Sequence, residues 1–179
     1  MANINDYLIW RGDIPIIPGA EFNEIDSMIL ARFSYLIFDR IDLKEKEKIE
    51  SISKKMSIFE NDEFNYNGDR DLIINLGEST RFRDMIATDY VKNNDKEVEK
   101  QFSAITIHIS DDEMYLSFLG TDKTILGWKE DFNLSFMKNI PAQIEGLNYL
   151  NKIAGKYPNK RIRIGGHSKG RKRCCLFCN

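Results

Sequence analysis

Hydrophobic residues recur at three- and four-residue steps through much of the first half of the chain. Between Phe22 and Phe38 they mark a wide apolar face, which is typical of a helix that buries one side. The spacing is sparser in the Lys- and Glu-rich segment 44–56 and returns over residues 79–91. Segment 61–70 is polar and rich in turn-forming residues. The pattern therefore predicts a buried helix over 22–38, a surface helix over 44–56, a loop over 61–70 and a further helix over 79–91.

The pattern changes after residue 100. Segments 102–109 and 114–119 are rich in β-branched and aromatic residues, and Ser110-Asp111-Asp112-Glu113 between them has turn chemistry. These three segments predict a β-hairpin.

Helical spacing resumes over residues 124–137 and 140–157, and the second of these segments has Pro141 in its first turn. Lys160 to Ile164 then forms a short strand signal that leads into glycines. Two strand segments separated by helices indicate a crossover connection within one sheet. This order predicts an α/β fold.

The chain has 179 residues, of which 42% are hydrophobic and 30% are charged. This length and composition suit one core, so we expect a single domain over 1–179. It would comprise a mainly helical region (1–100), a region with the hairpin, helices and last strand (101–170), and an atypical tail (171–179).

The charges, 26 basic and 28 acidic residues, are spread along the chain and give a formal net charge of -2. No field of one sign is available to gather phosphates or anionic lipid, so we expect no nucleic-acid partner. The N-terminus lacks the pattern of a signal peptide, and no apolar run approaches the roughly 18 residues that span a bilayer. We therefore expect a cytoplasmic protein without stable membrane insertion.

All three cysteines lie near the end of the chain, at Cys174, Cys175 and Cys178. The last two have the spacing of half a zinc site, but the chain has only two histidines and nothing nearby supplies a second ligand pair. We expect neither a metal nor an organic cofactor.

One motif carries candidate chemistry. The run Gly166-His167-Ser168-Lys169-Gly170 fits Gly-x-Ser-x-Gly, in which two glycines allow a sharp turn from strand to helix that exposes the serine hydroxyl. The strand signal at Arg161–Ile164 directly before it is the expected context. Ser168 is thus a candidate nucleophile, and the Lys169 amide would be one donor of an oxyanion hole. The nucleophile elbow around Ser168 would consist of Gly166, His167 and Gly170.

The segment Leu116–Asp122, followed by Trp128–Asp131, resembles the strand-Gly-Thr-x(n)-Trp-x-x-Asp stretch of the class 3 lipases. In that family the Thr position helps to form the oxyanion hole, so the resemblance implies Thr121 as the second donor. Trp128 itself has helical spacing with Phe132, which predicts a buried position.

Segments 4–13 and 22–26 are similar to the opening of the Mbeg-like family, uncharacterised bacterial proteins with a lipase-like α/β-hydrolase fold. With Gly165–Gly170 added, the likeness covers residues 3–170. The resemblance implies a three-layer α/β-hydrolase fold and a serine esterase or lipase-like activity on a small-molecule or lipid ester.

The chain departs from such hydrolases after the nucleophile. Their catalytic acid and histidine follow the serine, yet segment 169–179 contains no histidine and no carboxylate side chain. One choice of codons for the tail, read in a shifted frame, encodes Gly-Asn-Ala-Ala-Val-Tyr-Phe-Ala, which restores the small and apolar helix typical of the family. We therefore expect a truncated domain that lacks the C-terminal strands and helices.

The two histidines present do not replace the missing base. His167 adjoins Ser168, but neighbouring side chains on a sharp turn diverge, and His108 has the pattern of an ordinary strand residue. Without a base, only about 10³- to 10⁴-fold acceleration over water would remain. We expect this fragment to be nearly inactive.

A second function stays open, that of a non-catalytic α/β-hydrolase-like binding domain that keeps the serine elbow only as structure. The basic run Arg171-Lys172-Arg173 has too few charges for stable binding to an anionic partner at physiological salt. In a truncated domain the strand at 161–164 would form an exposed edge, which predicts self-association through that edge.

Overall fold

The computed structural model describes residues 3–95, 97, 100–120, 124–133 and 140–167. Their single sheet has five strands in the order β1-β2-β3-β4-β5, of which the first four are antiparallel and β5 runs parallel to β4. The strands are β1 (Lys46–Lys48), β2 (Ile86–Asp95), β3 (Lys100–His108), β4 (Glu113–Phe118) and β5 (Arg161–Gly166).

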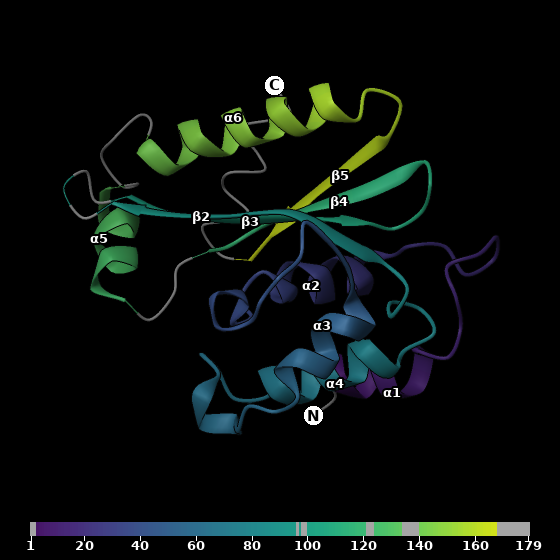
Figure 1. Cartoon of the computed structure of the whole chain (residues 1–179). Helices are drawn as coiled ribbons and strands as arrows, with labels where there is room; N and C mark the ends of the chain where they lie inside the picture. Colours follow the sequence, from purple (N-terminus) through teal and green to yellow (C-terminus); the bar gives the residue numbers. More distant parts are fainter. Residues whose placement is uncertain (1–2, 96, 98–99, 121–123, 134–139, 168–179) are drawn as a thin grey trace.

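Helices cover both faces of this sheet and give a three-layer arrangement (Figure 1). One face carries four helices, the other face carries α6 (Pro141–Lys156), and α5 (Ile125–Asn133) lies at one end of the sheet. The four helices are α1 (Ile4–Arg11), α2 (Glu24–Phe33), α3 (Ile49–Met56) and α4 (Asp69–Glu78), with 3₁₀ turns at η1 (Phe38–Arg40) and η2 (Asn61–Glu63).

The sheet separates two hydrophobic cores. Alternate side chains of β3 enter different cores, because successive residues of a strand point to opposite faces. Ile105 and Ile107 pack with the residues of α1 to α4, whereas Phe102 and Ala104 pack with those of α6. Because helices cover both faces of the sheet, β3 is almost wholly buried.

Several predicted elements are confirmed. The hairpin is formed by β3 and β4, the last helix is α6, and the strand before the glycines is β5. The chain therefore has the mixed α/β content that was predicted, with a parallel strand added through a crossover.

Other predicted elements are corrected. Residues 79–91 do not form a helix, because the chain turns there and then pairs with β3 as strand β2. Residues 46–48 pair with β2 as β1, so the predicted surface helix begins only at Ile49. Its apolar residues Ile49, Ile52 and Met56 are buried and Lys54 is exposed, as expected of a helix that lies on the surface of the domain.

The remaining differences concern the ends and faces of helices. The buried helix predicted over 22–38 ends at Phe33, and α4 begins inside the polar segment 61–70. Trp128 on α5 is 70% exposed, so the prediction that it is buried was wrong.

A buried ion pair fastens the loop between α1 and α2 to the rest of the domain. The guanidinium of Arg81 donates to both carboxylate oxygens of Asp26, at 2.8 and 2.5 Å, and both side chains are fully buried. Arg81 also donates to four main-chain carbonyl oxygens of the loop, those of Ile14, Pro15, Ala20 and Glu21. One side chain thus satisfies several carbonyl groups that have no partner in a helix or strand.

Candidate functional site

The two parallel strands of the sheet end side by side. Ser117 of β4 pairs with Gly165 of β5, and Phe118 pairs with Gly166. The carboxyl ends of adjacent parallel strands form the crevice in which α/β proteins bind their ligands. The segment predicted to supply the oxyanion hole therefore leaves the sheet beside the segment predicted to form the nucleophile elbow.

Gly120 brings these two segments into contact. A Cβ atom at this position would collide with the carbonyl oxygen of His167 and with the hydroxyl of Tyr35. Only the absence of a side chain at Gly120 allows the backbone after β4 to approach the backbone after β5 this closely.

Gly165 has a similar role near the end of β5, directly before Gly166. A Cβ atom there would collide with the Tyr115 hydroxyl. That hydroxyl donates to the main-chain oxygen of Ser27 at 2.9 Å and lies 3.0 Å from Ser27 Oγ. Gly165 thus leaves room beside β5 for the Tyr115 side chain, which joins β4 to α2.

Tyr35 lies beneath the start of the elbow. Its side chain is buried, its hydroxyl is 3.4 Å from His167 Nδ1, and the two rings meet edge to face at 5.9 Å. Its main-chain oxygen accepts a hydrogen bond of 3.1 Å from the Asn65 side chain. The Arg32 guanidinium lies 5.1 Å from the centre of the Tyr35 ring.

Arg32 is itself held by Asp69, whose Oδ1 accepts from Arg32 Nε at 2.9 Å and from Nη2 at 2.6 Å. A connected set of side chains therefore fixes the position of the Tyr35 hydroxyl. Sequence reasoning missed Tyr35, because nothing local distinguishes it from the other aromatic residues of an apolar segment.

Of the predicted site residues, Gly166 ends β5 and His167 follows it as an exposed residue. Thr121, Ser168, Lys169 and Gly170 lie outside the described residues. The structure thus shows where the two predicted segments begin and that these beginnings touch.

His108 lies at the other end of the sheet. It pairs with Met114, four positions before the end of β4, which corresponds to about 13 Å at the usual rise of a strand. Its Nε2 is 3.1 Å from Thr88 Oγ1, and its Nδ1 is 3.3 Å from Lys160 Nζ. Burial, and then the positive charge of Lys160, lower the pKa of His108. This environment suits a neutral structural histidine better than a base for the elbow.

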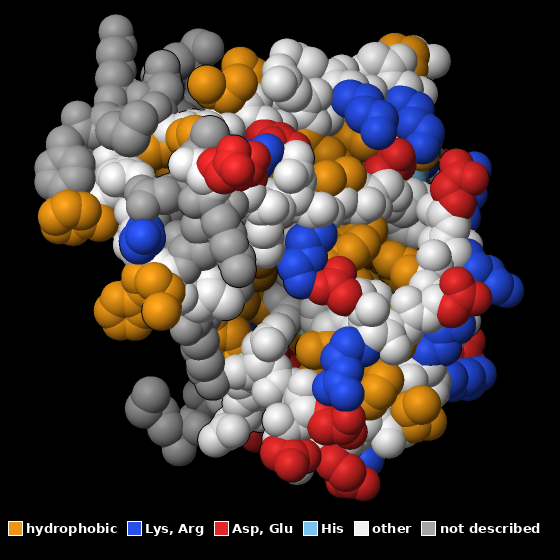
Figure 2. Space-filling model, turned by 60° about the vertical axis from the view of Figure 1, so that its left-hand side comes forward, with side chains coloured by type: hydrophobic (Ala, Val, Ile, Leu, Met, Phe, Trp, Pro, Cys, Tyr) orange, Lys and Arg blue, Asp and Glu red, His pale blue; other side chains and the backbone are white. Residues whose placement is uncertain are grey.

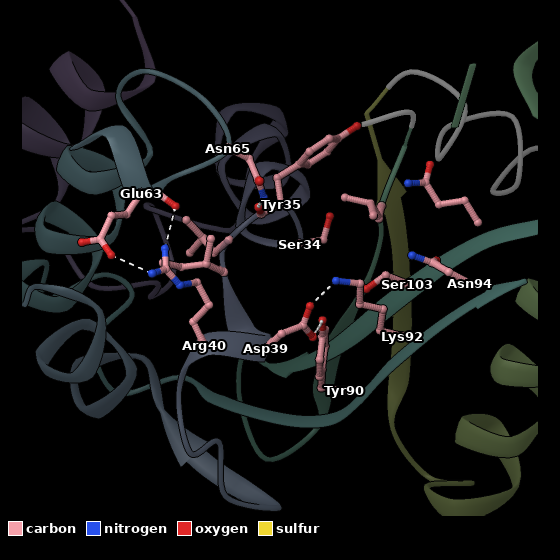
Figure 3. Close-up of a pocket in the computed structure, with 14 residues that line it drawn as sticks. Ser34, Tyr35, Asp39, Arg40, Glu63, Asn65, Tyr90, Lys92, Asn94 and Ser103 are labelled. Atoms are coloured by element: carbon pink, nitrogen blue, oxygen red, sulfur yellow. Dashed lines mark hydrogen bonds and ion pairs between the residues drawn. The ribbon is translucent and has the colours of Figure 1, made fainter. Parts of the chain in front are cut away.

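A pocket of about 200 Å³ opens next to the ends of β4 and β5. Figure 3 shows Ser34 and Tyr35 between two charged pairs, with Arg40 and Glu63 on one side and Asp39 and Lys92 on the other. Its lining comes from the segment after α2, the η2 segment, β2, β3 and the residue after β4. The residues are Ser34, Tyr35, Leu36, Ile37, Asp39, Arg40, Glu63, Asn65, Tyr90, Lys92, Asn94, Gln101, Ser103 and Leu119.

Metal-binding clusters and membrane-spanning helices would point to other classes of function. Across the described part of the chain, no group of three or more His, Cys, Asp or Glu side chains is arranged to hold a metal ion. Within the same part, every helix is too short or too polar to cross a membrane.

Comparison with known protein families gives a match over residues 76–175, which is more than half of the chain. The chain belongs to the Mbeg1-like family. The Mbeg1-like match runs from the end of α4 through β5, so it includes Gly120, the elbow motif and the helices between them. It confirms the family predicted from the sequence. No curated protein and no solved structure matches the chain.

Proposed function

We propose that this member of the Mbeg1-like family is a serine hydrolase of the esterase or lipase type. Ser168 would attack the carbonyl carbon of a small-molecule or lipid ester, and the main-chain amides of Lys169 and Thr121 would bind the oxyanion. The fold would then be the N-terminal portion of a lipase-like α/β-hydrolase.

The observation that carries this proposal is the contact of Gly120 with His167. The amides of Thr121 and Lys169 can stabilise one oxyanion only if the segments after β4 and β5 converge on the same point. Gly120 of the first segment already touches His167 of the second. This contact lies at the carboxyl ends of β4 and β5, where α/β folds bind their ligands.

The proposed reaction also needs a base to take the proton from the Ser168 hydroxyl. His108 is at the far end of the sheet, and His167 Nδ1 faces the Tyr35 hydroxyl. We therefore expect the reaction at Ser168 to be slow in this chain, because the oxyanion hole and binding act without a general base.

Labelling with a fluorophosphonate tests the proposal, since this probe forms a bond with the oxygen of an activated serine and releases fluoride. We expect slow labelling of Ser168, faster labelling when free imidazole is added as a base, and no labelling of that site in Ser168→Ala. Ser110→Ala, which changes an exposed serine in the hairpin turn, is the matched control and should label normally.

The positions of the two histidines favour a second candidate function, a binding domain without catalysis. It predicts that Ser168 stays unlabelled even with imidazole present. That result would overturn the hydrolase proposal.

Truncation is a separate hypothesis that the gene's nucleotide sequence tests. We expect the shifted frame after the Ser168 codon to continue without an early stop and to encode an Asp or Glu followed by a His. Early stops in that frame would refute it.

A further inference from the structure

The pocket beside the strand ends shares its wall with the candidate site. Tyr35 lines the pocket and also approaches His167, and Leu119 lines it one residue before Gly120. A substrate group bound there would therefore lie against the segment that we propose to carry the oxyanion hole.

The inner region of this pocket is polar. Ser34, Gln101 and Ser103 line it and are themselves buried. Asn65 and Asn94 add two side-chain amides. Hydroxyl and amide groups offer both donors and acceptors, as do the hydroxyl groups of a sugar or polyol.

The charges around the pocket are balanced. Lys92 forms an ion pair with Asp39, whose Oδ1 also accepts from the Tyr90 hydroxyl at 2.9 Å. Arg40 Nη2 forms a second ion pair with Glu63 Oε1 at 2.6 Å. Because each charge faces a partner of opposite sign, the pocket favours an uncharged ligand over a phosphate or a carboxylate.

Apolar side chains complete the lining. Leu36, Ile37 and Leu119 are buried there and offer a surface for C–H groups. With a volume of about 200 Å³, the pocket is smaller than the roughly 300–1,000 Å³ that drug-sized ligands occupy. It suits a group of the size of one sugar ring, whereas a long acyl chain requires a mainly apolar lining.

We propose that this pocket binds an uncharged, polyhydroxylated group, such as a glycosyl or glyceryl moiety, of the ester on which Ser168 acts. This inference rests on the proposed hydrolase function for the role of the bound group as a component of the substrate. The binding itself does not require Ser168 to react.

Titration followed by ¹H–¹⁵N NMR tests the inference. We expect methyl α-glucopyranoside or glycerol to shift the amide signals of residues 34–40 and Ser103, and decanoate to leave them unchanged. Shifts caused by decanoate alone, or by none of the three probes, would overturn the inference.

Two neighbouring asparagines on β2 supply a matched pair of variants. Asn94 lines the pocket, whereas Asn93 bonds to Glu145 on α6 at 2.7 Å. We expect Asn94→Ala to raise the dissociation constant of the sugar or polyol about fivefold, the usual effect of one lost hydrogen bond. Asn93→Ala should leave it unchanged, and equal effects of both variants would contradict the assignment.

The two proposals fail separately. Labelling of Ser168 without binding of either polyhydroxylated probe would refute the pocket assignment and leave the hydrolase standing. Binding of a probe with no labelling of Ser168 would refute the hydrolase and leave a sugar- or polyol-binding pocket.

Discussion

The approach of the segment after β4 to the segment after β5 depends on a single residue, Gly120. Any side chain at this position collides with the backbone at His167 and with the Tyr35 hydroxyl. Tyr35 has little freedom to move aside, because its side chain is buried, the Arg32 guanidinium lies over its ring and Asn65 bonds to its main-chain oxygen. The geometry of the candidate site is therefore sensitive to the smallest possible substitution.

We predict that Gly120→Ala destabilises the fold by about 1–3 kcal/mol, the usual cost of overpacking, and slows labelling of Ser168. Thermal unfolding and probe kinetics measure the two effects. The control is Gly155→Ala on α6, where a Cβ atom meets nothing within 4 Å. Alanine there should stabilise the helix by about 0.5–1 kcal/mol, so equal effects of the two variants would contradict the collision at Gly120.

At the scale of elements, local patterns predicted those regions of the fold whose pairing is local. The hairpin of β3 and β4 follows from two segments rich in β-branched and aromatic residues around one turn, and α6 follows from a long helical spacing. The predicted site segments directly follow β4 and β5, two strands with local sequence signals, which explains why the motif and its context could be found from sequence.

Strand β2 was mistaken for a section of helix for a physical reason. Its pairing with β3 shifts register between Thr88 and Val91, and Asp89 there has a left-handed backbone conformation with φ of 53°. Such a bulge breaks the alternation that identifies a strand and leaves apolar residues at three- and four-residue steps. Tyr35 escaped detection because its contact with His167 joins segments that are distant in sequence.

The loop between α1 and α2 is the element most dependent on one residue. We predict that Arg81→Ala destabilises the protein by about 3–5 kcal/mol, because it leaves the Asp26 carboxylate buried without its partner. Chemical denaturation measures this loss. Lys54→Ala, which breaks the exposed pair with Glu50 on α3, should have little effect. A similar small effect for Arg81→Ala would show that the buried ion pair does not hold the loop.

At the scale of the whole molecule, the chain carries nearly equal numbers of basic and acidic residues, 26 and 28. Figure 2 shows basic and acidic side chains interspersed across one face. Among the described residues, β5 pairs only with β4 and so ends the sheet. Arg163 on this strand is held by Glu113, with 2.7 Å between Nε and Oε1.

We predict that Arg163→Thr increases self-association, because a charged residue on an edge strand opposes pairing with a second chain. Sedimentation velocity at several concentrations measures the change. Lys152→Thr on α6 removes the same charge away from the sheet edge and should leave the monomer fraction unchanged. If both variants self-associate equally, the change in net charge explains the association, and the prediction for the β5 edge is wrong.

The parallel pairing of β5 also affects the order in which the protein folds. β2, β3 and β4 meet through short connections, whereas β5 can join β4 only after α5 and α6 have been synthesised. Contacts between distant segments form slowly, because a long loop must close first. We therefore expect the contact between Gly120 and His167 to form last, so that a chain emerging from the ribosome completes its antiparallel strands before its candidate site.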